Sequence, residues 1–305
     1  MRSWLKQSLP LPLAAAAYTL IAKEGVTQYA PLSYVSFGLT GAACLTLIHA
    51  YARNAISAPN LSSIAAGAAV GAGVVAQVIA IDAAPNPGLA SAVFRSQSAL
   101  TVLASAALLR GELDSVAIGA IGMTLTGVYL ATSGRTTTPR NKAKEHTRTE
   151  DHTHGQATAG KSWARAAALA AVLLTTKDLL SVVSVRSGIK PAGMAAIEVT
   201  TAAVVANAYK LYKTGTLSPR SVDAKASSPW VLVAASVIMA LWPNLVTRAM
   251  SSAPNSGYPK AMGLAGVALA TLASQALYNE PISARAWGGI ALIIAGTTGL
   301  VLQGH

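Results

Sequence analysis

The chain has 305 residues, of which 52% are hydrophobic and 11% are charged, and its mean hydropathy is +0.47. An ordinary soluble domain carries about 25% charged residues, so this composition excludes that class and favours a chain whose solvent is lipid. The net charge of +12 does not indicate nucleic-acid binding, because the basic residues are spread over predicted loops and span ends without interleaved aromatic residues. We assign it to positive charge beside a membrane.

Apolar runs of about 20 residues, the length that crosses the hydrocarbon core as a helix, fill most of the chain. There are ten of them, at residues 10–29, 32–51, 61–81, 88–109, 114–132, 164–184, 191–212, 229–249, 258–278 and 283–303. They lack the alternation of apolar and polar residues that is typical of membrane β-barrels. The sequence therefore predicts an all-α membrane protein with ten transmembrane helices.

The first run carries a charged pair, Lys23 and Glu24, deep in its sequence, and the sixth run carries a similar pair, Lys177 and Asp178. A charged side chain inside a span costs about 2.5–3.5 kcal/mol on insertion scales, which makes these residues functional candidates. Each acidic neighbour lies about 100° around the helix, so we do not expect it to neutralise the lysine. The lysines either extend to the headgroups or line a cavity, and the recurrence of the pair favours the cavity.

Arg95 lies about eight residues into the fourth run, too deep to face lipid, and we expect it to take part in a binding site. The motif GAAVG at 67–71 in the third run predicts close helix packing through small side chains. Glu112 and Glu280 precede or begin the last span of each half, where a carboxylate stabilises a helix N-terminus, and we expect a structural role for both.

Residues 133–162 form the one long polar stretch, and they separate five runs from five. We expect a first five-helix repeat at 1–132, this linker, and a second repeat at 163–305. The linker contains three histidines, His146, His152 and His154. Their spacing matches no established metal-ligand motif, so we expect a solvated linker and no metal site.

Glu198 lies well inside the seventh run, with no charged residue within four positions. It either takes up and releases a proton or forms an ion pair with a lysine or arginine of another span. In the eighth run Pro243 removes a backbone donor and kinks the helix, and Trp242 and Asn244 flank it. That kink either lines a site or serves packing. The candidate substrate-binding residues are Lys23, Glu24, Arg95, Lys177, Asp178, Glu198, Trp242 and Asn244.

The two halves repeat one another in sequence. APNPGLASAVF at 84–94 returns as APNSGYPKAMG at 253–263, and residues 84–127 match 253–296 at 16 of 44 positions without a gap. An odd number of spans in each half would make the second half enter the membrane in the opposite orientation. The sequence thus predicts two inverted five-helix repeats, an arrangement typical of transporters.

The end of each half, ALLRGELDSVAIGAIGMTLTGVYLA at 107–131 and ALYNEPISARAWGGIALIIAGTTGLVL at 276–302, resembles the helix–Glu–helix signature of EamA-type members of the drug/metabolite transporter superfamily. The resemblance implies a secondary transporter with a central cavity lined by spans 1, 3, 4, 6, 8 and 9, with contributions from spans 2 and 7. It also implies cytosolic termini. The loop charges indicate instead that the linker at 133–162 is cytosolic, so the orientation and the membrane itself stay open.

We expect a carrier that moves a small polar metabolite by alternating access through that cavity. Lys23, Lys177 and Arg95 would hold an anionic group, and Glu198 would balance charge or couple protons or a counter-substrate. Two alternatives stay open: efflux of organic cations with Glu198 as the counter-ion, and a non-transporting membrane scaffold of the same fold. The chain shows no nucleophile elbow, phosphate loop or catalytic triad spacing, so we expect no enzymatic activity and no cofactor.

Overall fold

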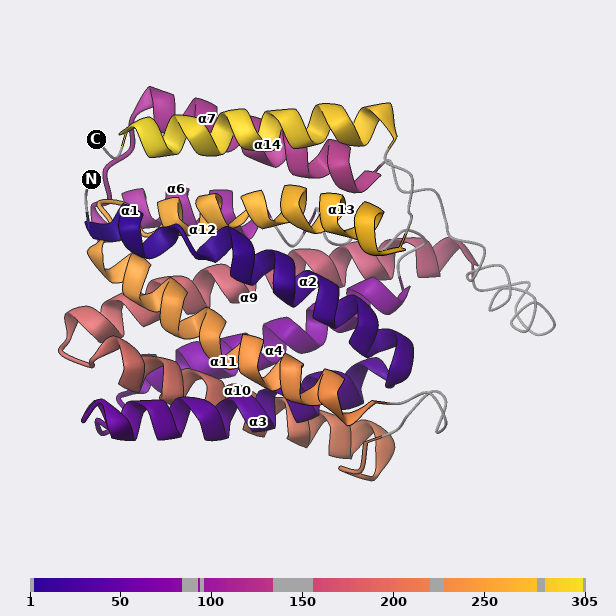
Figure 1. The fold of residues 1–305 in the computed structure, drawn as a ribbon. Helices are drawn as coiled ribbons and strands as arrows, with labels where there is room; N and C mark the ends of the chain where they lie inside the picture. The colour runs from indigo at the N-terminus through magenta and orange to yellow at the C-terminus, as the bar shows by residue number, and fades with distance from the viewer. Residues whose placement is uncertain are drawn as a thin grey trace.

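The computed structural model describes residues 3–83, 93, 96–133, 156–219, 228–278 and 283–303. The described chain is an all-helical bundle (Figure 1). Its helices are α1 (Ser3–Ser8), α2 (Leu11–Gln28), α3 (Pro31–Ala52), α4 (Leu61–Ala83), α6 (Gln97–Leu109), α7 (Ser115–Ser133), α9 (Gln156–Arg186), α10 (Pro191–Thr214), α11 (Pro229–Ser252), α12 (Gly257–Gly263), α13 (Ala265–Tyr278) and α14 (Ala284–Gln303).

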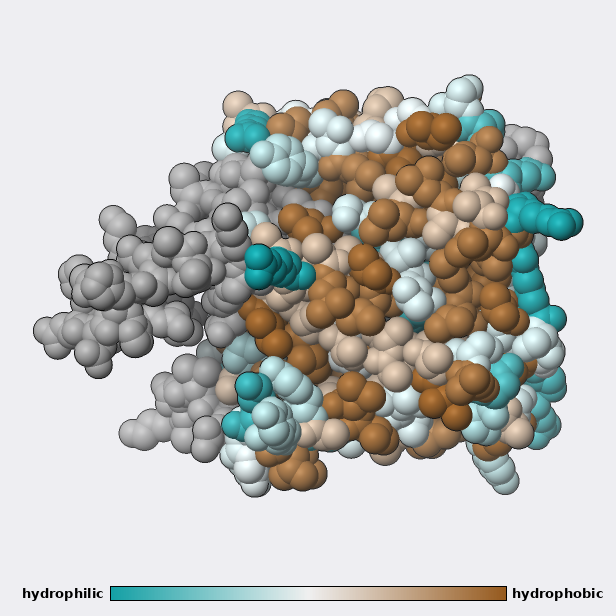
Figure 2. Space-filling view, turned by 180° about the vertical axis from the view of Figure 1, so that it is seen from behind, coloured by the Kyte–Doolittle hydropathy of each residue, from teal (hydrophilic) through white to brown (hydrophobic). Residues whose placement is uncertain are grey.

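Five segments of this bundle are long and apolar enough to cross a membrane: Pro31–Ala52, Leu61–Ala80, Trp163–Arg186, Pro229–Ser252 and Gly257–Leu277. Large apolar side chains also lie exposed on the outside, among them Leu13, Ile48, Leu108 and Val204. Figure 2 shows a broad apolar band over one face of the bundle, with hydrophilic residues gathered towards its two ends. This distribution indicates a multi-pass helical membrane protein.

Each of the ten predicted apolar runs contains a helix, but two boundaries were wrong. The run at 258–278 is divided into α12 and α13 at Leu264, where the backbone bonds span three residues: Leu264 N donates to Ala261 O (3.1 Å) and Val267 N to Leu264 O (2.9 Å). The predicted linker also ends earlier than residue 162, because α9 already begins at Gln156.

Proline begins three of these helices, and glycine follows the end of one of them. Pro31, Pro191 and Pro229 occupy the first positions of α3, α10 and α11, where a missing N–H costs nothing and the fixed φ suits the helix. Gly215 follows α10 with φ +67°, a left-handed conformation that glycine adopts without the strain a side chain would add. These residues fix where three apolar segments enter the bundle.

Close packing through small residues holds the outer pair, α7 and α14, together at one edge of the bundle (Figure 1). A Cβ atom at Gly127 would lie 2.5 Å from the carbonyl oxygen of Gly289, so a side chain cannot fit there. The predicted packing role of GAAVG is confirmed in the same way: a Cβ at Gly67 would lie 2.8 Å from Glu198 O, and one at Gly71 2.9 Å from Ala202 O. Helices α4 and α10 therefore touch along their backbones.

Helices from the two ends of the sequence pack in matched sets. Helix α3 packs on α10, and α7 packs on α14. Helix α4 packs on α9 and α10, while α11 packs correspondingly on α2 and α3. Helix α6 packs on α9, while α13 packs on α2. The bundle is thus built mainly by contacts between the two parts of the chain.

Candidate functional site

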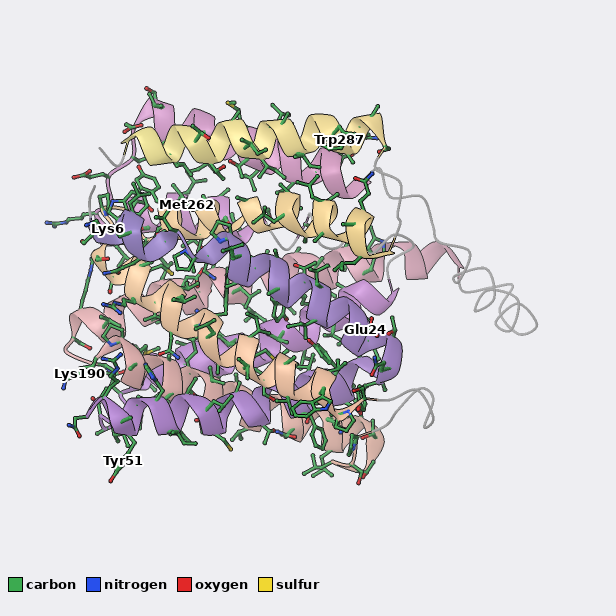
Figure 3. All side chains as sticks on the ribbon, in the orientation of Figure 1. Lys6, Glu24, Tyr51, Lys190, Met262 and Trp287 are labelled. Atoms are coloured by element: carbon green, nitrogen blue, oxygen red, sulfur yellow. The ribbon has the colours of Figure 1, made fainter. Side chains whose placement is uncertain are left out.

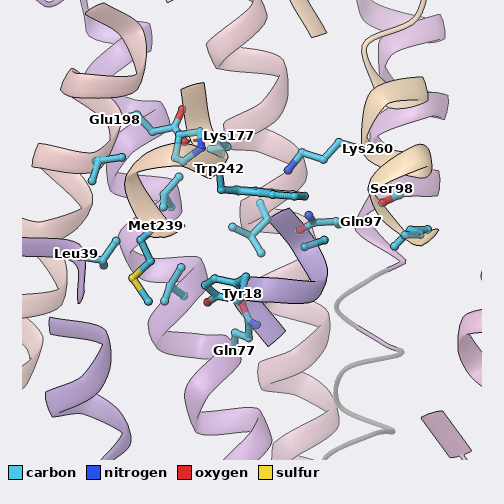
Figure 4. Close-up of a pocket in the computed structure, with 18 residues that line it drawn as sticks. Tyr18, Leu39, Gln77, Gln97, Ser98, Lys177, Glu198, Met239, Trp242 and Lys260 are labelled. Atoms are coloured by element: carbon cyan, nitrogen blue, oxygen red, sulfur yellow. Dashed lines mark ion pairs between the residues drawn. The ribbon is translucent and has the colours of Figure 1, made fainter. Parts of the chain in front are cut away.

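A cavity of about 180 Å³ lies where these helices meet. Its lining comes from α2, α3, α4 and α6 in the first part of the chain, and from α9, α10, α11 and α12 in the second. Most of the wall is apolar, with Leu39, Val70, Val74 and Met239 among its side chains (Figure 4). The outer helices α7 and α14 contribute no lining residue.

The charged part of the wall begins with an ion pair between α9 and α10. Lys177 Nζ lies 2.9 Å from Glu198 Oε1, and the two side chains are 5% and 1% exposed. The second carboxylate oxygen, Glu198 Oε2, accepts a hydrogen bond of 3.0 Å from Ser181 Oγ, one turn along α9 from Lys177. Both oxygens of Glu198 are therefore engaged.

A second ion pair adjoins the first and brings in α12. Asp178 Oδ1 lies 3.3 Å from Lys177 Nζ and 3.1 Å from Lys260 Nζ. Asp178 Oδ2 accepts a hydrogen bond of 3.2 Å from Thr101 Oγ1 of α6, and Asp178 itself is fully buried behind the cavity wall. Four helices thus meet at one cluster, whose two positive and two negative charges balance. Such a cluster satisfies buried charges that would otherwise be very costly.

Trp242 of α11 lies beside this cluster at the cavity. Lys260 Nζ lies 5.9 Å from the centre of its ring, within cation–π range, and Figure 4 shows Lys260 pointing towards the indole. The remaining polar lining residues are uncharged: Tyr18, Gln77, Gln97 and Ser98. The arrangement can therefore hold a small molecule between an apolar wall and a patch of lysines, with the indole at the boundary.

Of the predicted site residues, the structure brings Lys177, Asp178, Glu198 and Trp242 together. The expectation that Asp178 cannot neutralise its neighbour was wrong, because the long lysine side chain folds back to reach the adjacent carboxylate. That expectation took only the 100° between the two Cβ directions into account and neglected the length of the lysine stem.

Two predicted residues lie elsewhere. Glu24 accepts a hydrogen bond of 2.7 Å from Gln28 Nε2 near the end of α2, and Figure 3 shows it at the opposite end of the bundle from Lys6 and Lys190. Asn244 Nδ2 donates to Ala240 O of its own helix (2.9 Å) and does not line the cavity. The side chain of Lys23 and the whole of Arg95 lie outside the described residues, as do Glu280 and the three linker histidines.

Lys260 is the site residue that the sequence analysis missed. It stands two residues after the start of the predicted run 258–278, where a lysine usually extends to the membrane surface. The signal that could have found it is the repeat itself: Lys260 aligns with Ser91 in the first copy of the phrase, so only one copy carries a charge at this position.

Comparison with known proteins supports the fold and nothing finer. No protein-family model matches the chain, and no curated protein matches it. A solved structure described as "Crystal structure of protein" is similar along nearly its whole length: the match covers 99% of this chain and 98% of that one, with a TM-score of 0.77 and 17% sequence identity. At that identity the likeness shows a shared helical fold.

Proposed function

We propose that the chain is a secondary transporter that moves a small polar metabolite across a membrane by alternating access through this cavity. The observation that carries the proposal is the position of the charged cluster. It lies at a cavity between helices of the first and second parts of the chain, so a bound solute would touch both. Relative movement of the two parts could then open the cavity to either side.

The matched packing supports a ten-span bundle of two inverted repeats, of the kind that the EamA-type resemblance implies. Several contacts, such as α4 on α9, have a counterpart in which the roles of the halves are exchanged, here α11 on α2. The self-matched pairs α3–α10 and α7–α14 would lie on the axis that relates the halves. The start of α1 and the end of α14 lie at the same end of the bundle, as an even number of spans requires (Figure 1).

The test is uptake of labelled solute by the purified protein in liposomes. A panel of organic acids, amino acids, nucleobases and amines is first screened by thermal stability in detergent, and each ligand that stabilises the protein is then assayed for flux. A ligand at about 100 times its Kd should stabilise by about 2.7 kcal/mol. We expect Glu198→Gln to reduce flux, whereas Glu112→Gln, a matched change at an exposed loop residue, should leave it unchanged. Binding of no solute and flux of none would favour the scaffold alternative.

A further inference from the structure

The four charged residues of the cluster differ in the number of contacts that each one makes. Lys177 makes two ion pairs, one to each carboxylate. Lys260 makes one, to Asp178, and it also lies over the face of Trp242. An ammonium group has three N–H donors. Lys260 is therefore the cation with the most unused donor capacity, and it lines the cavity.

The two carboxylates have less free capacity to bind a ligand than Lys260 has. Glu198 Oε1 is paired with Lys177, and Oε2 lies 3.0 Å from Ser181 Oγ, whose hydroxyl is shared with the carbonyl oxygen of Lys177 at 2.8 Å. Asp178 is fully buried, with Oδ1 held between two lysines and Oδ2 bound by Thr101. A cationic ligand would have to break one of these contacts before it met a free carboxylate oxygen. An anionic ligand can bind Lys260 while every described contact of the two carboxylates remains.

The rest of the lining sets the size and character of the ligand. Apart from the cluster, the described wall carries no charge, so a second charged group on the ligand would find no partner there. The indole of Trp242 and the apolar side chains of α3, α4 and α11 offer surface to an apolar body. One anionic end and one apolar body fit this combination.

We propose that Lys260 is the anion-binding residue of the cavity, and that its ligand is an organic monoanion whose apolar body lies against Trp242. The inference rests on the proposed transport function for the identity of the cavity as a substrate site. It adds the class of substrate and assigns the decisive contact to a residue of α12. In the absence of ligand, Asp178 holds the Lys260 ammonium beside the cavity.

Three probes with one body and different charge test this: 3-phenylpropanoate, 3-phenylpropanamide and 3-phenylpropylamine, titrated by calorimetry into the detergent-purified full chain. We expect the anion to bind at least tenfold more tightly than the amide or the amine. Lys260→Met should weaken the anion by about tenfold to a hundredfold, the usual effect of a hydrogen bond to a charged group, and should leave the amide within about threefold. Lys260→Arg should retain most of the preference for the anion.

Lys210→Met is the matched control, because Lys210 is also a buried lysine but binds the carbonyls of Leu217 and Ser218 at the end of α10. If Lys260→Met fails to fold, the wild-type protein still decides: 3-phenylpropanoate should slow acetylation of Lys260, read by mass spectrometry, and should not slow that of exposed Lys6. Protection of neither lysine would overturn the assignment.

The other outcomes are equally decisive. Tightest binding by the amine, or an anion affinity that Lys260→Met leaves unchanged, would overturn the proposal, and so would the failure of all three probes to bind. Flux in liposomes separates this from the proposed function. Anion binding without flux of any solute would defeat transport and leave the anion site standing. Flux that does not respond to Lys260→Met would defeat the anion site alone.

Discussion

Replacing one member of the Lys177–Glu198 ion pair should lower the free energy of unfolding more than replacing both. Glu198→Leu leaves two lysines on one carboxylate, and Lys177→Met leaves Glu198 with Ser181 as its described partner. Breaking a buried ion pair in this way costs about 3–5 kcal/mol, whereas replacing both members by apolar residues is often neutral. The double variant keeps the Asp178–Lys260 pair and the Thr101 hydrogen bond. We therefore expect it to be more stable than either single variant.

Thermal unfolding in detergent measures this order directly. A loss of about 3 kcal/mol corresponds to a fall in Tm of about 6–12 °C for a chain of moderate size. The two single variants should show such a fall, and the double variant should lie within a few degrees of the wild type. Ser181→Ala removes one hydrogen bond, worth about 1 kcal/mol, and serves as the mild control. A double variant whose loss equals the sum of the single losses would refute the coupling, because independent sites add.

Two further predictions concern other contacts. Gly127→Leu should lower Tm sharply, since the new side chain would meet the backbone of α14. Gly119→Leu is the control and should be tolerated, because a Cβ atom there meets no described atom within 4 Å. Equal Tm values for the two variants would contradict the packing of α7 on α14. Lys210→Met should speed trypsin cleavage after α10, because Lys210 Nζ donates hydrogen bonds of 2.9 Å to two loop carbonyl oxygens. An unchanged cleavage rate would show that these hydrogen bonds are not needed to hold the loop.

The helices could be predicted because each one is encoded locally. A run of apolar residues with proline at its start specifies a helix regardless of what it packs against, and α3 and α10 both begin in this way. In α10 the glycine after the end, Gly215, adds a second local signal. The division between α12 and α13 was not predicted, because Gly263 and Gly266 are also compatible with an unbroken, closely packed helix. A Cβ at Gly266 would lie 2.6 Å from the carbonyl oxygen of Pro12, so this glycine is needed for packing as well.

The site could be predicted only in part because its members meet across helices. Intramembrane charge identified Lys177, Asp178 and Glu198, since the cost of such residues makes each of them conspicuous. Their partners Thr101 and Ser181 carry no such signal, because hydroxyl residues are common in helices that pack closely. Spacing in one chain cannot show that Thr101 lies 3.2 Å from a carboxylate 77 positions away.

Residues that the two sequence copies share and residues in which they differ lie in different parts of this protein. Residues shared by the two copies, such as Gly127 and its counterpart Gly296, lie at the contact of α7 with α14, where symmetry serves packing. Lys260 departs from its counterpart Ser91, and it lies at the cavity with unused donors. A site on the axis between equal halves would offer a ligand two equivalent contacts. In the proposed carrier, a charge carried by one copy would instead fix which end of an asymmetric ligand binds the second half.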